Sequence, residues 1–135
     1  MHYSDEEIRS SYKIEPLEGV IYQVSFLRPI LDIDDDIKMA QFINEEFGEI
    51  LARNAGKNFR ILVDFSALGR ENKVTPKARR IYENLLSDPR VEKIAVISLN
   101  SYTTVMMNFI VFAARISSKL KIFSGQKAAL EWLKK

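Results

Sequence analysis

The few side chains in this sequence that could do chemistry stand mostly where predicted strands or helices begin or end. Asp64 closes an apolar run, Ser66 follows two residues later, and Asn100 follows the next apolar run. Ligands of open parallel sheets gather at the carboxyl ends of the strands, so these three side chains are the candidate lining of a ligand crevice. The alternative is that the Asp64 carboxylate accepts hydrogen bonds from backbone amides of the following turn, which would make it structural.

Other residue types limit the chemistry further. The absence of cysteine excludes disulfides, thiolate catalysis and cysteine–zinc sites. The single histidine, His2, falls in residues 1–10, which are expected to form a mobile lead-in. Neither a dinucleotide-binding glycine motif nor a phosphate-binding loop is present. We therefore expect no catalytic residue, no metal and no cofactor.

A run of acids at Asp32, Asp34, Asp35 and Asp36 does not match a calcium-binding loop. Such a loop needs a glycine at its sixth position and a glutamate at its twelfth, and both positions hold isoleucine. Acids in the first turn of a helix interact favourably with the positive end of its dipole, and this is the role expected of them.

Thr75 stands directly before Pro76, a combination typical of a helix N-terminus. We expect Thr75 to cap this helix, and an aspartate at the same position to be tolerated. Positive charge gathers around the helix start. It comes from Arg70, Lys73, Lys77, Arg79 and Arg80. This cluster is either a solvated surface or a site for a phosphate or an acidic side chain.

Five strands are predicted by the spacing of apolar residues. Alternating patterns on either side of turn residues 16–19 indicate a hairpin, unbroken apolar runs indicate strands covered on both faces, and an alternating segment with lysines suits an edge. The predicted strands are 12–15, 20–26, 59–65, 94–99 and 119–123.

Four helices are predicted between and after these strands, where apolar residues recur every three or four positions. They cover 32–55, 76–86, about 100–116 and 126–134. The resulting order, β-β-α-β-α-β-α-β-α, indicates an α/β fold with a mixed, mostly parallel five-stranded sheet and right-handed crossovers. The length of 135 residues suits a single domain, residues 1–135.

The helix expected at 100–116 is apolar around more of its circumference than one sheet face requires. Its candidate interface or apolar-pocket residues are Tyr102, Val105, Met106, Phe109, Phe112 and Ala113. Either the last helix covers the surplus, or a second subunit or an apolar ligand does.

Composition sets the class of protein. Hydrophobic residues make up 47%, charged residues 28%, and the formal net charge is +2, which predicts a folded protein without general affinity for nucleic acid. No signal peptide is recognisable, and the most apolar stretch is about half a membrane span, so we expect a cytoplasmic protein without an integral membrane segment.

From about Tyr12 to Leu133 the sequence resembles the SpoIIAA-like family, relatives of the STAS domain (sulphate transporter and anti-sigma-factor antagonist). The likeness consists of the hairpin and long helix, Val63-Asp64-Phe65-Ser66, Lys93-Ile94-Ala95-Val96-Ile97, Lys121-Ile122-Phe123 and Ala129-Leu130-Glu131-Trp132-Leu133. It implies a SpoIIAA/STAS-like sheet with packed helices and a role in protein interaction or ligand sensing.

Antagonists of this kind carry an Asp-Ser-Ser-Gly-like phosphorylation motif where a helix follows the third strand. Here the sequence is Asn72-Lys73-Val74-Thr75-Pro76, so Thr75 is a candidate phosphosite by position although the serine pair and glycine are missing. Some SpoIIAA-like proteins are also similar to CRAL-TRIO lipid-binding domains.

These observations lead to two hypotheses for the function of the protein. The first is a non-enzymatic, STAS-like interaction or regulatory module, homodimeric or with another protein partner. The second is a binding protein for a small apolar or amphipathic, lipid-like molecule held between the third helix and the sheet.

Overall fold

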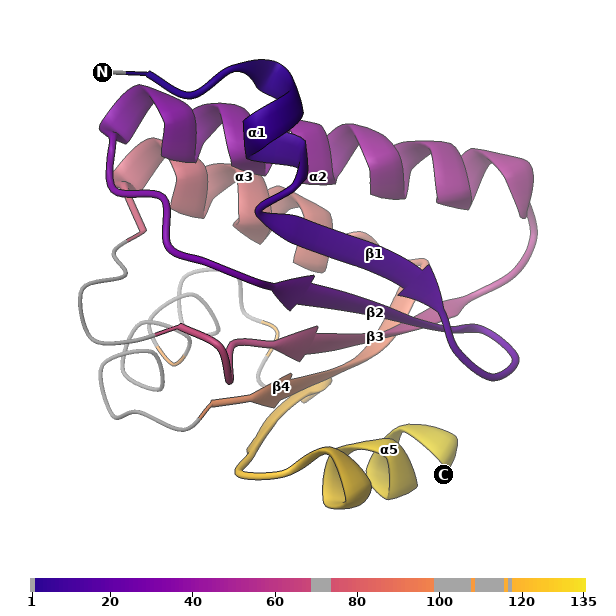
Figure 1. Ribbon diagram of the computed structural model, residues 1–135. Coiled ribbons are helices and arrows are strands. Elements are labelled where there is room, and N and C mark those ends of the chain that lie inside the picture. Colours follow the sequence, from indigo (N-terminus) through magenta and orange to yellow (C-terminus); the bar gives the residue numbers. More distant parts are fainter. Residues whose placement is uncertain (1, 69–73, 99–107, 109–115, 117) are drawn as a thin grey trace.

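The computed structural model describes residues 2–68, 74–98, 108, 116 and 118–135. Five strands form one sheet in chain order (Figure 1). They are β1 (Tyr12–Pro16), β2 (Ile21–Phe26), β3 (Phe59–Asp64), β4 (Val91–Ile97) and β5 (Leu120–Phe123). β1 is antiparallel to β2, and all later neighbours are parallel, which confirms the mixed, mostly parallel sheet of the predicted α/β class.

The described helices are α1 (Asp5–Arg9), α2 (Ile33–Arg53), α3 (Pro76–Leu86) and α5 (Gln126–Lys134). Three of them lie where the sequence predicted helices. The helix predicted at about 100–116 falls outside the described residues, apart from Asn108 and Ile116. Within the described ranges, no helix combines the length and the apolar character needed to cross a membrane.

Helices cover the sheet on both faces, with α2 and α3 on one side and α5 on the other (Figure 1). Parallel neighbours in chain order, joined by crossovers of one hand, place their connecting helices on the same face, as α2 and α3 are. The unbroken apolar run of β3 follows from this arrangement. Ile61 and Val63 join the core under α2 and α3, whereas Leu62 packs with Ala129 and Leu133 of α5.

The two edges of the sheet also match the sequence pattern. β5, with its alternating lysine, is an edge strand, and β1 forms the opposite edge. β4 begins at Val91, three residues before the predicted start, because Val91 is buried and pairs with Phe59.

The N-terminal segment differs from the mobile lead-in expected over residues 1–10. Ser4 and Glu7 form a reciprocal capping box at the start of α1, and Ile8 is fully buried in the main core. The guanidinium of Arg9 lies 3.9 Å from the centre of the Phe42 ring on α2. These contacts hold the segment against α2.

The apolar stripe predicted for the helix over 32–55 begins at Ile33, but the buried stripe of α2 does not include this residue. Ile33 is in line with Ala40 and Phe47, because seven residues are close to two helical turns. Ala40 and Phe47 are buried, but Ile33 is 64% exposed. The first turn of α2 therefore presents its apolar side chain beyond the core.

Candidate functional site

The predicted ligand crevice begins with Asp64, the last residue of β3. Its Oδ1 accepts a hydrogen bond from the backbone N–H of Ser66 at 2.8 Å, while the Ser66 side chain is exposed. This is the turn-holding hydrogen bond that the structural alternative predicted for Asp64. Asn100, the third candidate, lies outside the described residues, so a crevice formed by all three stays a prediction.

Thr75 caps α3 as predicted. Its Oγ1 accepts from the backbone N–H of Ala78 at 3.2 Å, and Pro76 occupies the first turn. The backbone N–H of Thr75 donates in turn to Oδ2 of Asp36 on α2, at 3.0 Å. One carboxylate therefore ties the starts of α2 and α3 together.

Asp36 is 4% exposed, and its expected interaction with the helix dipole gave no indication of this burial. Burial raises the pKa of its carboxyl, against the opposing effect of the hydrogen bonds from Thr75. Burial, and then the charge of Asp36, hold the pKa of Tyr82 well above its usual value. The sequence did contain a signal, because Asp36 is spaced four and seven residues from the buried Ala40 and Ile43.

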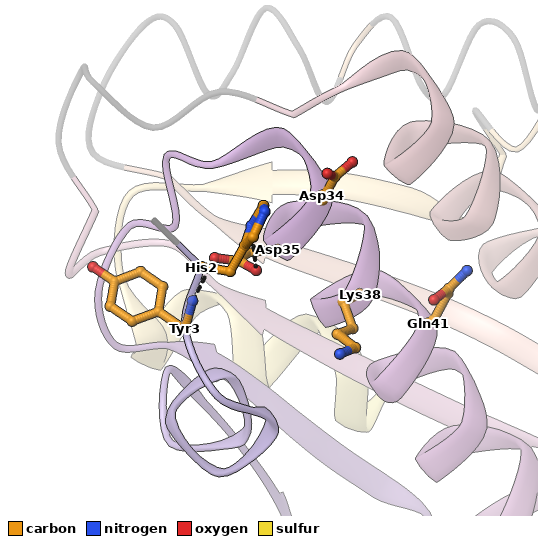
Figure 2. Close-up of a pocket in the computed structure, with 6 residues that line it drawn as sticks. All are labelled: His2, Tyr3, Asp34, Asp35, Lys38 and Gln41. Atoms are coloured by element: carbon orange, nitrogen blue, oxygen red, sulfur yellow. Dashed lines mark hydrogen bonds and ion pairs between the residues drawn. The ribbon is translucent and has the colours of Figure 1, made fainter.

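His2 and Tyr3 lie against the first turn of α2 (Figure 2). The backbone N–H of Tyr3 donates to Oδ2 of Asp35 at 2.9 Å, and His2 Nδ1 lies 3.5 Å from Oδ1 of the same carboxylate. Asp35 is 3% exposed, so these contacts give a buried carboxylate its partners. An open hollow of about 330 Å³ lies here. It is lined by His2, Tyr3, Asp34, Asp35, Lys38 and Gln41.

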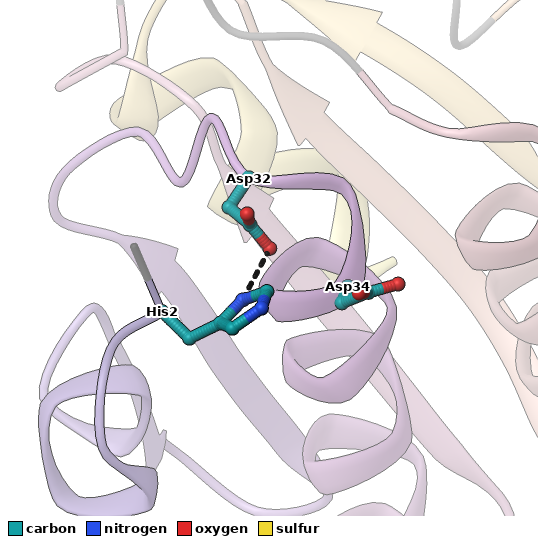
Figure 3. A group of neighbouring side chains, drawn as sticks. All are labelled: His2, Asp32 and Asp34. Carbon is teal, nitrogen blue, oxygen red and sulfur yellow. Dashed lines mark hydrogen bonds and ion pairs between the residues drawn. The ribbon is translucent and has the colours of Figure 1, made fainter.

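Three possible metal ligands meet beside this hollow. One atom each of His2, Asp32 and Asp34 lie within 4.8 Å of one another, but Asp34 points away from the other two (Figure 3). Asp32 Oδ1 already accepts from Asp35 N and contacts His2 Nδ1, both at 3.0 Å. The amide of Asp35 in particular lowers the pKa of Asp32. Because the positive end of α2 also opposes a cation, the cluster is explained as a helix cap and we assign no metal to it.

Several exposed apolar side chains occur at the start of α2 and in the connection that precedes it. Among the described residues, the large hydrophobic side chains that are most exposed are Tyr3 (41%), Leu27 (49%), Leu31 (66%) and Ile33 (64%). Leu27 and Leu31 lie in the connection from β2 to α2, and Ile33 opens α2. The Arg28 guanidinium lies 5.6 Å from the centre of the Tyr3 ring, which brings Tyr3 to this connection. We call these four residues the connection surface. No pattern predicted this surface, because Leu27 and Leu31 lie between the predicted strand 20–26 and the predicted helix 32–55, and Ile33 was expected to face the core.

The basic cluster is partly described. Lys77 and Arg80 are exposed on α3, and Arg79 lies 3.8 Å from Glu83 in an ion pair. Arg70 and Lys73 lie outside the described residues. The same holds for the candidate interface or pocket residues of the third helix, which are Tyr102, Val105, Met106, Phe109, Phe112 and Ala113. Neither a subunit contact nor an apolar pocket there is tested by the described part of the chain.

Comparisons with known proteins place the fold. The family model described as "Domain of unknown function (DUF7793)" matches residues 24–135. No curated protein matches the sequence significantly. The chain is similar to a solved structure of an uncharacterized protein from the DUF3478 family with a SpoIIAA-like fold, from Shewanella loihica PV-4. The TM-score is 0.63 at 14% identity, over 90% of this chain and 91% of that one. This likeness confirms the SpoIIAA-like, STAS-like fold that the sequence resemblance implied.

Proposed function

This chain belongs to the DUF7793 family of unknown function, and we propose that it is a non-enzymatic, STAS-like interaction module that forms a homodimer through the connection surface. The observation that carries the proposal is the exposure of Leu27, Leu31 and Ile33 within seven residues of chain, with Tyr3 beside them. Single exposed apolar side chains are ordinary, whereas several large ones within a short segment suggest a protein contact.

The framework beneath this surface supports a binding role. Asp35 accepts from the backbone of Tyr3, and Asp36 accepts from the backbone of Thr75, so two buried carboxylates fix the segments around the first turn of α2. Apolar side chains on an ordered framework lose little conformational entropy when a partner covers them. The proposal is non-enzymatic because Asp64, the acid best placed for chemistry, is engaged by its own turn.

The test is sedimentation velocity and light scattering of the wild-type protein over a concentration series from low to high micromolar. We expect a monomer–dimer equilibrium. Leu31→Ser and Ile33→Ser should each weaken the dimer by about tenfold, since truncating an anchor that becomes buried costs about 1–2 kcal/mol.

The control is Leu130→Ser on α5, which removes a partly buried leucine that packs against the smaller core cluster on the opposite face of the sheet. It should leave the dimerisation constant unchanged, with thermal melts checking that all three variants stay folded. A wild-type protein that remains monomeric at the highest concentration contradicts the proposal. Equal weakening by Leu130→Ser also contradicts it.

A further inference from the structure

The helices α2 and α3 begin side by side with opposite charges. Both start at the same end of the sheet (Figure 1), and the hydrogen bond between Thr75 and Asp36 fixes their relative position. The first turn of α2 contains Asp34, Asp35 and Asp36, whereas the first turn of α3 contains no acid. At these starts, the exposed charges are therefore negative on α2 and positive on α3.

Two of these charges have no ion-pair partner in the described part of the chain. Asp34 is exposed and is in none of the ion pairs found here. His2 pairs with Asp32, and Lys38 of α2 pairs with Asp5 of α1. Lys77 is exposed in the first turn of α3, where the helix dipole opposes a cation. Its own helix therefore gives this lysine no stabilisation, and an acidic group from outside the chain would.

A second copy of the chain supplies that group. In a two-fold symmetric dimer, each residue of one copy that contacts a given residue of the other is contacted in the same way in return. An acidic helix start beside a basic one is complementary to itself under this symmetry. The exposed connection surface, next to the acidic start, provides the apolar contact that such charges would surround.

We propose that the dimer is two-fold symmetric and that Asp34 of each copy pairs with Lys77 of the second copy. Arg80, exposed one turn further along α3 on the same side as Lys77, adds to the positive side of each contact. This inference rests on the proposed function, because it says how the two copies recognise each other across the connection surface.

The test reverses each charge, with Asp34→Lys and Lys77→Glu made separately. The dimer dissociation constant of each protein alone should be at least about tenfold higher than that of wild type, because like charges then meet at both symmetric contacts. Mixing the two proteins should restore a heterodimer of near wild-type affinity. In that heterodimer the introduced lysine faces the introduced glutamate at one contact, and the original pair remains at the other. Isotope labelling of one protein lets native mass spectrometry separate heterodimer from homodimer.

The control pair is Glu49→Lys and Lys57→Glu, which makes the same charge changes on exposed residues at the other end of α2. Their homodimers should match wild type, and mixing them should give only the statistical share of heterodimer. Asp34→Asn is a milder second variant, expected to weaken the dimer less than Asp34→Lys.

The outcomes separate this inference from the proposed function. If Leu31→Ser weakens the dimer but the charge reversals at 34 and 77 do not, the pairing is overturned and the apolar interface stands. The pairing is also overturned if both reversals weaken the dimer but mixing the two proteins forms no heterodimer. A wild-type monomer overturns both proposals.

Discussion

The backbone N–H of Thr75 donates to Oδ2 of Asp36 across the starts of two helices, with 3.0 Å between the atoms. Asp36 belongs to α2 and is buried, and Thr75 caps α3, so a single carboxylate sets the position of the second helix against the first. Thr75, the candidate phosphosite by position, is thus already in contact with a buried carboxylate.

Replacing Asp36 with alanine should lower the free energy of unfolding by about 1–3 kcal/mol, because the buried acceptor of the Thr75 amide is lost. Asp36→Asn keeps one acceptor oxygen and should lower it less. Urea unfolding measures both changes. Glu45→Gln, at an exposed acid on the same helix, is the control and should stay within about 0.5 kcal/mol of wild type; an equal loss there would contradict a specific role for Asp36.

The same carboxyl should make stability depend on pH. Burial raises the pKa of Asp36 above its ordinary 3.8, so the folded protein binds this proton more tightly than the unfolded chain. The resulting stabilisation is present below the ordinary pKa and is lost as the pH rises through the folded pKa. The unfolding free energy of wild type minus that of Asp36→Asn should therefore fall as the pH is raised from acid toward neutral. A difference that stays constant or grows with pH would contradict this direction.

At position 75, a neutral capping side chain should preserve the stability of the protein better than a charged one. Thr75→Ala should cost about 0.5–2 kcal/mol as a lost helix cap, and Thr75→Ser should stay close to wild type. The sequence alone predicted that Thr75→Asp would be tolerated, but Asp36 contacts Thr75, and two carboxylates there repel each other. Chemical unfolding at neutral pH should therefore show Thr75→Asp to be less stable than Thr75→Asn, which caps without charge. The opposite order would show that the cap outweighs the repulsion.

Asp64 should behave as a turn residue. Asp64→Asn keeps an acceptor for the Ser66 amide, whereas Asp64→Ala removes it and should cost about 0.5–1.5 kcal/mol. Thermal and urea unfolding of the two variants measure the difference. Equal stability of wild type and Asp64→Ala would remove the structural explanation and return Asp64 to the ligand crevice.

The helix predicted at about 100–116 gives a separate expectation. Its wide apolar arc, including Met106, Phe109 and Phe112, should contact either a second subunit or a bound apolar molecule. Native mass spectrometry of freshly purified protein detects a co-purified lipid, whereas a subunit contact at this helix requires that Phe109→Ser weaken the dimer. A ligand-free monomer would contradict both versions and leave the last helix as the cover of this arc.

Most of the fold could be predicted from the sequence because its signals are local. The unbroken apolar runs of β3 and β4 required cover on both faces, Thr75 and Pro76 marked the start of α3, and Asp64 stood where an aspartate can hold its own turn. These features depend on periodicity and on side chains that bond within a few residues of themselves. The chain alone therefore determined the α/β class, the order of the five strands and the Thr75 cap, whereas α1 and its Ser4 cap were not predicted.

Tertiary packing decided the features that carry the candidate site. Asp35 and Asp36 lie in the first turn of a helix, where acids are commonly exposed, yet both are buried. The backbone N–H of Tyr3, 32 residues away in the sequence, donates to Asp35, and that of Thr75, 39 residues away, donates to Asp36. Ile33 continues the buried stripe of α2 by spacing, yet it is exposed, although Ile30 before it and Asp35 and Asp36 after it are buried. Which side chains fall inside the core and which remain at its edge is set by distant segments, and no local pattern encodes that boundary.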